Sequence, residues 1–176
     1  MDGELEKRIR AKIRDVPDYP KKGILFKDIT PLLKDHCTFS ACIDALADSF
    51  KGEKIDYAAG VEARGFIIGG ALAGKLGVGF VPIRKKGKLP YRKVSIDYEL
   101  EYGKETLEAH EDAVEKGSSV LIVDDLLATG GTARAAADLV QKMGASIIGF
   151  GFIVELSELN GRGKLGGQRI VSLIRY

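Results

Sequence analysis

The stretch VLIVDDLLATGGTARAAADLV, residues 120–140, predicts a buried strand, a glycine turn and a helix in direct succession. Residues 119–123 are almost wholly apolar, which is typical of a parallel strand covered by helices on both faces. Two carboxylates, Asp124 and Asp125, follow the strand, and a helix is expected over residues 132–143. Gly144 then stands where glycine commonly ends a helix. The stretch therefore predicts one strand–loop–helix unit of an α/β protein.

The alternation of strands and helices continues on both sides of this unit. Further strands are expected at residues 55–61, 79–83, 147–154 and 169–174, and a helix rich in glycine and alanine at residues 66–76. We therefore predict an α/β fold with a doubly wound, mainly parallel sheet flanked by helices. In such sheets ligands bind where the carboxyl ends of strands meet helix N-termini. A length of 176 residues fits one domain, residues 1–176.

The N-terminal segment, residues 1–35, carries a different pattern. Its apolar residues fall on one helical face, so a helix is expected to end before Pro17; they are Leu5, Ile9, Ile13 and Val16. Residues 17–31 are expected to form a loop. A second amphipathic helix is expected up to Phe50, with Thr38 as its N-cap.

Residues 94–102 alternate between apolar and polar side chains. This period of two predicts an antiparallel hairpin, or flap, with one apolar face. A basic run, RKKGKLPYRK, precedes it at residues 84–93 and holds six basic residues and no acid. The run is either a solvated loop, since charge runs are common, or a loop that focuses positive potential on an anionic small substrate. The local sequence leaves both interpretations open.

The turn Thr129-Gly130-Gly131-Thr132 stands at the start of a predicted helix, just after the two aspartates. Its glycines let the backbone turn tightly, and the helix N-terminus offers unpaired N–H groups and partial positive charge to a phosphate. Its threonines add hydroxyl donors. The aspartates would repel a phosphate but accept hydrogen bonds from sugar hydroxyls. We therefore predict a site for a phosphorylated ribose; the alternative is a glycine turn beside two solvated aspartates.

Several other classes of protein are not indicated. The lysine of the G-x-x-x-x-G-K-[ST] mononucleotide loop is missing, and no G-x-G-x-x-G joins a strand to a helix. A net charge of +2 is too small to indicate nucleic-acid binding. No window approaches the roughly 18 apolar residues of a membrane span, and the first residues lack the apolar core of a secretory signal. Cys37 and Cys42 are interpreted as reduced thiols of a cytoplasmic protein.

Several stretches, in the same order along the chain, resemble one family. VDDLLATGGT is similar to the phosphoribosyl pyrophosphate (PRPP) signature of the type I phosphoribosyltransferases. Residue by residue it is most similar to the signature of the adenine phosphoribosyltransferases. PDYPKKGILFKDITPLLKD resembles the family's base-binding segment, and GVEARGFIIGGALA resembles its pyrophosphate loop and the helix that follows. VPIRKKGKLP, YELEYGKETLE, HEDAVEKG and FIVELSELNGRGKL continue the match. The resemblance implies transfer of a phosphoribosyl group from PRPP to adenine, giving AMP and pyrophosphate in purine salvage.

The resemblance also implies a role for each matching residue. The ribose hydroxyls would be held by Asp124 and Asp125, and the 5′-phosphate by Ala128, Thr129, Gly130, Gly131 and Thr132. The pyrophosphate would meet Arg64, on the loop after the strand at residues 55–61, together with Arg84, Lys85 and Lys88. Adenine would bind at Leu25, Phe26, Lys27 and Leu159, with the ring of Phe26 stacked on the base. Glu101 matches the family's catalytic loop acid and would manage the purine proton.

The family implies an architecture and partners as well. Residues 1–35 would form a base-binding hood, and residues 84–110 the basic segment with a mobile catalytic loop in a flexible β flap. Mg²⁺ would be held mainly by the substrate, with few protein ligands. The protein would form a homodimer, in which Arg84 could act at the neighbouring site, and would bind neither nucleic acid nor membrane.

One departure from the family and two alternatives are visible. The family usually has Asp, then Ser or Ala, before Arg-Gly, whereas this chain has Glu62-Ala63, the peptide bond expected to be cis by the resemblance. The extra methylene of Glu62 changes the local geometry of that loop. One alternative is a transferase for hypoxanthine, guanine or xanthine, against which DLLATGGT argues. The other is a PRPP-sensing regulator, although such proteins normally add a DNA-binding module.

Overall fold

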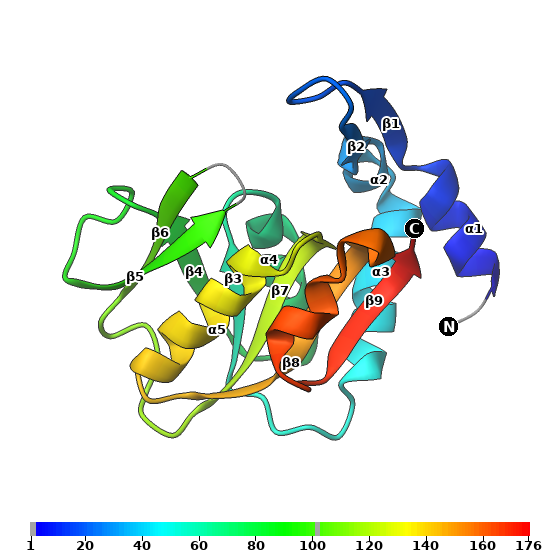
Figure 1. Ribbon diagram of the computed structural model, residues 1–176. Helices are drawn as coiled ribbons and strands as arrows, with labels where there is room; N and C mark the ends of the chain where they lie inside the picture. Colours follow the sequence, from blue (N-terminus) through cyan, green and yellow to red (C-terminus); the bar gives the residue numbers. More distant parts are fainter. Residues whose placement is uncertain (1–2, 101–102) are drawn as a thin grey trace.

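A computed structural model of the chain describes residues 3–100 and 103–176. Within these residues seven strands form one sheet in the order β5-β6-β4-β3-β7-β8-β9 (Figure 1). The parallel strands are β3 (Tyr57–Val61), β4 (Gly79–Lys85), β7 (Ser119–Leu127), β8 (Ser146–Glu155) and β9 (Ile170–Arg175). The antiparallel edge is formed by β5 (Lys93–Leu100) and β6 (Gly103–His110). The predicted doubly wound, mainly parallel α/β sheet is confirmed.

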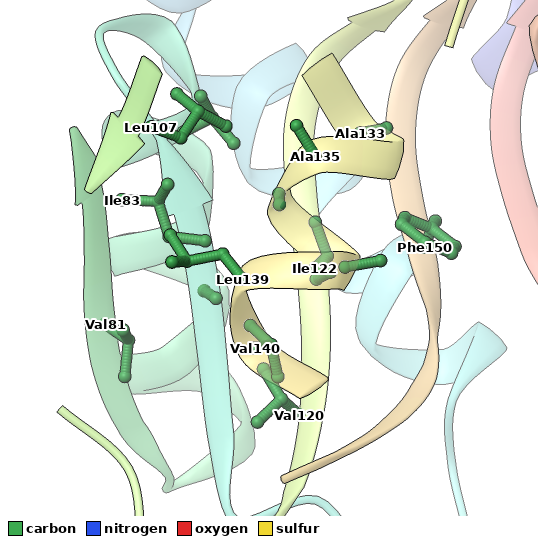
Figure 2. Packing of buried hydrophobic residues seen from close by; sticks show 14 of the residues in the cluster. Val81, Ile83, Leu107, Val120, Ile122, Ala133, Ala135, Leu139, Val140 and Phe150 are labelled. Carbon is green, nitrogen blue, oxygen red and sulfur yellow. The ribbon is translucent and has the colours of Figure 1, made fainter. Parts of the chain in front are cut away.

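Helices cover both faces of this sheet. They are α1 (Gly3–Ala11), α2 (Thr30–Lys34), α3 (His36–Ser49), α4 (Arg64–Leu76) and α5 (Gly131–Lys142), with short 3₁₀ turns η1 (Ser157–Leu159) and η2 (Gly161–Leu165). Successive side chains of a strand point to opposite faces. Val120 and Ile122 of β7 accordingly pack with Leu139 and Val140 of α5 (Figure 2). Leu121 and Val123 of the same strand join the other core cluster, with residues of α1, α3 and α4.

A separate antiparallel pair, β1 (Arg14–Pro17) and β2 (Leu25–Asp28), forms most of the N-terminal hood. Figure 1 shows this pair and α2 projecting beyond the sheet on the side of α1 and the C-terminus. The helix predicted to reach residue 16 ends instead at Ala11, and the predicted loop over residues 17–31 contains β2 and the start of α2. The prediction was wrong here because Arg14–Pro17 pairs with a strand distant in sequence, and that pairing overrides the helical spacing.

Other boundaries also differ from the prediction. Asp35, not Thr38, caps α3: its side chain accepts a hydrogen bond from the Thr38 N–H at 2.9 Å. β7 continues through both aspartates to Leu127, because its neighbour β8 pairs with it as far as Glu155. α4 begins at Arg64, so this arginine is the first residue of a helix and not part of a loop. The predicted hairpin of β5 and β6 is confirmed, and Gly144 has the positive φ of 87° expected after α5.

In the part of the chain that the structure describes, no helix is long and apolar enough to cross a membrane.

Candidate active site

Arg64, Asp124 and Asp125, three of the predicted residues, meet at a point where the winding of the sheet reverses. β3 lies between β4 and β7 and is parallel to both. After β3 the chain first forms β4 on one side of it and later forms β7 on the other side. Ligands of doubly wound sheets bind at such a switch point, outside the carboxyl ends of the strands. Arg64 begins the helix after β3, and Asp124 and Asp125 lie near the end of β7. Tertiary structure thus unites residues that are 60 positions apart.

An ion pair joins these two strand ends. The Nε of Arg64 lies 2.5 Å from Oδ2 of Asp125, a residue only 4% exposed. Oδ1 of Asp124 accepts a hydrogen bond from the backbone N–H of Asp125 at 2.8 Å. Burial and the neighbouring carboxylate of Asp125 raise the pKa of Asp124 well above its ordinary value. Hydroxyl donors or a cation placed here would stabilise the ionised carboxylate.

Gly65 allows the start of α4 to lie close to Asp124 near the end of β7. A Cβ on Gly65 would lie 2.8 Å from Oδ1 of Asp124, closer than van der Waals contact permits. Any larger residue would therefore push the start of α4 away from the aspartate. The preceding Glu62–Ala63 peptide bond is cis, as the family resemblance implied.

The predicted phosphate-binding turn, residues 129–132, lines a small cavity. Its volume is about 180 Å³, and residues 124–133 line it together with Arg64 and Phe152. Gly130 adopts a left-handed conformation, with φ of 80°, and no side chain caps the start of α5. The first turn of the helix thus presents backbone donors to this cavity, as an anion site requires. Ala128, Thr129, Gly130, Gly131 and Thr132 all line it, as a shared phosphate site would need.

A larger cavity of about 610 Å³ adjoins the small one and shares Arg64, Asp124, Asp125 and Thr132 with it. Lys85 and Lys88 line this larger space, whereas Arg84 does not. Arg84 instead forms an ion pair with Glu62 at 2.9 Å and donates to the Lys88 carbonyl at 3.0 Å. Two lysines of the basic run therefore line the candidate cavity, whereas Arg84 lies outside the cavity of its own chain.

Among the predicted base-binding residues, Phe26 approaches a residue that lines both cavities. The guanidinium of Arg64 is 5.5 Å from the ring centre of Phe26, which also makes an edge contact with Tyr19. Lys27 turns its ammonium group to Asp15 at 2.8 Å and over the ring of Tyr176. Leu25 and Leu159 are 48% and 40% exposed. None of the four predicted base-binding residues lines either cavity, but Phe26 contacts Arg64, which lines both.

Sequence reasoning missed the polar flap residues of the larger cavity. Tyr98 and Glu105 of the flap line the cavity, although Tyr98 was predicted only as part of an apolar face. Period-two alternation placed its ring correctly, but the partner of its hydroxyl depends on the tertiary fold. Glu101 lies outside the described residues.

Comparison with known proteins gives the class of this site. The sequence profile of the phosphoribosyl transferase domain matches residues 30–164, which include all the strands that form the two cavities. The fold and the site are thus those of a phosphoribosyltransferase.

Relatives define the class more narrowly. The chain is 57% identical to the adenine phosphoribosyltransferase of Methylococcus capsulatus over 169 residues, which cover 96% of this chain and 99% of that protein. The structure is similar to that of adenine phosphoribosyltransferase from Thermoanaerobacter pseudethanolicus, with a TM-score of 0.94, 54% identity and coverage of 97% and 99% of the two chains. The enzyme from Saccharomyces cerevisiae, solved with an imino-altritol bisphosphate and adenine, has a TM-score of 0.92 at 41% identity over 98% of this chain and all of that one. This chain belongs to the adenine phosphoribosyltransferase family.

Proposed function

We propose that the protein transfers the 5-phosphoribosyl group of PRPP to adenine, giving AMP and pyrophosphate. The observation that carries the proposal is the pair of adjoining cavities that share Asp124 and Asp125. One has a helix N-terminus suited to a phosphate, and the other has lysines suited to a pyrophosphate. PRPP carries these two groups at opposite ends of one ribose, so its shape matches the arrangement.

The ribose 5-phosphate half of the substrate is assigned to the turn after β7. The backbone N–H groups at the start of α5 and the hydroxyls of Thr129 and Thr132 would bind the 5′-phosphate. Asp124 and Asp125 would accept hydrogen bonds from the 2′- and 3′-hydroxyls. Arg64 pairs with Asp125 and would fix that carboxylate toward the ribose.

The pyrophosphate half is assigned to the larger cavity. As the bond at C1 breaks, negative charge develops on the leaving group, and Arg64, Lys85 and Lys88 would stabilise it there. Mg²⁺ bound to PRPP would supply further neutralisation of the pyrophosphate oxygens. Asp124 and Asp125, which line both cavities, would supply carboxylate oxygens to an ion that the substrate carries.

The base is assigned to the hood beside Phe26. Arg64 contacts the Phe26 ring and also lines the proposed ribose site. A base stacked on Phe26 would therefore lie near the ribose, as the purine nitrogen that attacks C1 requires. The yeast neighbour was solved with adenine, and the Giardia lamblia neighbour with 9-deazaadenine. Glu101 would accept the proton that leaves the purine imidazole edge.

We also propose that the protein is cytoplasmic and works as a homodimer. The support for a dimer is the position of Arg84 outside its own cavity, close to the Phe66 ring of α4, and the 48% exposure of Ile67 on the same helix.

A turnover assay tests the function directly. The protein is incubated with Mg-PRPP and adenine, hypoxanthine or guanine, and nucleotide formation gives kcat/KM for each base. Main-chain groups that match adenine meet mismatched donors and acceptors on a 6-oxopurine, and each unpaired buried group costs about 1–3 kcal/mol. We therefore expect adenine to be preferred by at least about tenfold. Comparable values for the three bases would contradict the choice of adenine but leave the phosphoribosyl site standing.

Turnover of none of the bases would favour the PRPP-sensing alternative. A DNA-binding measurement at several salt concentrations would then test that reading, because phosphate contacts make such binding strongly salt-dependent.

A further inference from the structure

A carboxylate lies inside the larger cavity among its basic residues. Glu105 of β6 lines this cavity with Lys85 and Lys88, and its Oε1 is 3.0 Å from the Nζ of Lys85. An acid beside a group that binds a polyanion weakens that binding by repulsion. Anion binding therefore does not explain why Glu105 stands here.

The other carboxylate oxygen of Glu105 connects to the phosphate-binding turn. Oε2 accepts a hydrogen bond from the Tyr98 hydroxyl at 3.0 Å, and that hydroxyl lies 3.5 Å from Oγ1 of Thr132. Burial raises the pKa of Tyr98 to about 12, so its hydroxyl keeps the proton that it donates. Through these contacts the β5–β6 hairpin is tied to both anion subsites, at Lys85 on β4 and at Thr132 on α5.

We propose that Glu105 is a positioning residue that holds Lys85 against the β5–β6 hairpin in the free protein and yields it to the pyrophosphate group of PRPP. Leaving-group binding would then part the side chains of Glu105 and Lys85, and pyrophosphate release would restore their contact, while the backbone pairing of β6 with β4 persists. This inference rests on the proposed function of the site.

The exposure of the pair fits such an exchange. The side chains of Lys85 and Glu105 are 53% and 33% exposed, and partly exposed ion pairs stabilise only weakly. A ligand with several negative charges can therefore displace the carboxylate. The released carboxylate is free to turn to water.

The test is binding of Mg-pyrophosphate and of AMP, measured by calorimetry on the full chain. Glu105→Gln keeps the shape of the side chain and the acceptor for Tyr98 but removes the charge that holds Lys85. We expect pyrophosphate to bind about two- to fivefold more tightly, the change that a weak, partly exposed pair can give. AMP has no pyrophosphate, so its affinity should change by less than about twofold. With PRPP as substrate, KM should fall, and kcat should also fall if pyrophosphate leaves more slowly.

A double-mutant cycle separates the exchange from simple repulsion. In a Lys85→Met background, Glu105→Gln should no longer tighten pyrophosphate binding, because the lysine that it held is gone. Glu105→Asp keeps the charge but shortens the reach to both partners, so it should tighten binding in part. Equal tightening in both backgrounds, or none in either, overturns the proposal.

A matched control uses another acid of the same hairpin region. Glu111 pairs with Arg92 at 3.6 Å and does not line the cavity, so Glu111→Gln should leave both affinities unchanged. Because pyrophosphate binding needs no turnover, its result does not depend on the base that is used. Failure of the wild-type protein to form AMP would count against the proposed function, whereas failure of the cycle counts only against the role of Glu105.

Discussion

Asp125 is only 4% exposed and forms a direct ion pair with Arg64. When a ribose binds, the same carboxylate would contact both Arg64 and a sugar hydroxyl. Asp125→Asn keeps the size of the side chain but loses the charge that orients Arg64 and accepts from a sugar hydroxyl. Hydrogen bonds to charged groups contribute about 1.5–3 kcal/mol, so kcat/KM for PRPP should fall by about 10- to 150-fold. Thr129→Ala should also lose PRPP-dependent turnover.

Asp138→Asn is the matched control for this change. Asp138 also pairs with an arginine, Arg134 at 2.8 Å, but on the outer face of α5. Its substitution should leave kcat/KM and the thermal midpoint close to those of the wild type. A wild-type kcat/KM in Asp125→Asn would refute the assignment of this carboxylate to the substrate.

Phe26 and Lys27 are neighbours with different predicted effects on base binding. Phe26→Ala should weaken binding of every base by roughly 5- to 150-fold, since stacking on an aromatic ring is worth about 1–3 kcal/mol. The Lys27 side chain points to Asp15 and Tyr176, so only its backbone is available to read the base. Lys27→Met should therefore reduce stability but keep the preference for adenine. Loss of that preference in Lys27→Met, measured as the kcat/KM ratio of adenine to hypoxanthine, would contradict backbone recognition.

At the scale of elements, the phosphate-binding turn is supported from behind by η2. A Cβ on Gly161 would collide with the carbonyl oxygen of Ala128, and one on Gly130 with the carbonyl of Gly161. Gly161→Ala should therefore displace the turn, destabilise the protein by about 1–3 kcal/mol and raise KM for PRPP. Gly163→Ala in the same 3₁₀ turn meets only the side chain of Asn160, at 3.3 Å, and is the control. Thermal unfolding and PRPP kinetics of the two variants test this; equal KM values would contradict the support role.

The flap carries the predicted proton acceptor. General acid–base assistance is typically worth about 10²–10⁴-fold, so Glu101→Gln should lower kcat by that amount. Affinity for PRPP should change little, because Glu101 is not assigned to the sugar phosphate. Glu99→Gln changes a nearby exposed acid of β5 and should leave kcat unaltered. An unchanged kcat in Glu101→Gln would make this residue an ordinary surface acid.

At the scale of the whole molecule, the position of Arg84 allows a subunit-mixing experiment. Asp125→Asn should impair its own site by about 10- to 150-fold but keep Arg84, whereas Arg84→Ala should keep its own carboxylates. If Arg84 acts in the neighbouring subunit, a mixture of the two impaired variants should recover activity, because one site of each mixed dimer is complete. Light scattering first establishes the dimer. A mixture that remains as inactive as its components would show that Arg84 acts within its own chain, or not at all.

Local pattern was sufficient where a signal lies within a few residues. The apolar run before Asp124 and Gly144 predicted a strand and a helix end, and both are present. The glycines at 130 and 131 predicted a tight turn before a helix, which is also present, and the binding of an anion there stays a prediction. These features depend on the backbone preferences of neighbouring residues, so a short window of sequence contains their cause. Family resemblance added the cis bond at Glu62–Ala63, which no local pattern indicates.

Tertiary structure decided what depends on contacts between distant segments. Val16 has helical spacing but lies in a strand because Phe26 pairs with it, and β7 extends past its apolar run because β8 does. Arg64 was predicted to be near a phosphate, but only the switch point between β3 and β7 brings it to Asp125. The contact of Glu105 with Lys85 likewise exists only because β6 pairs with β4. The sequence by itself determined the chemistry of each segment. The pairing of strands determined which groups act on one another, because the free energy of strand pairing depends on two segments that lie far apart in the chain.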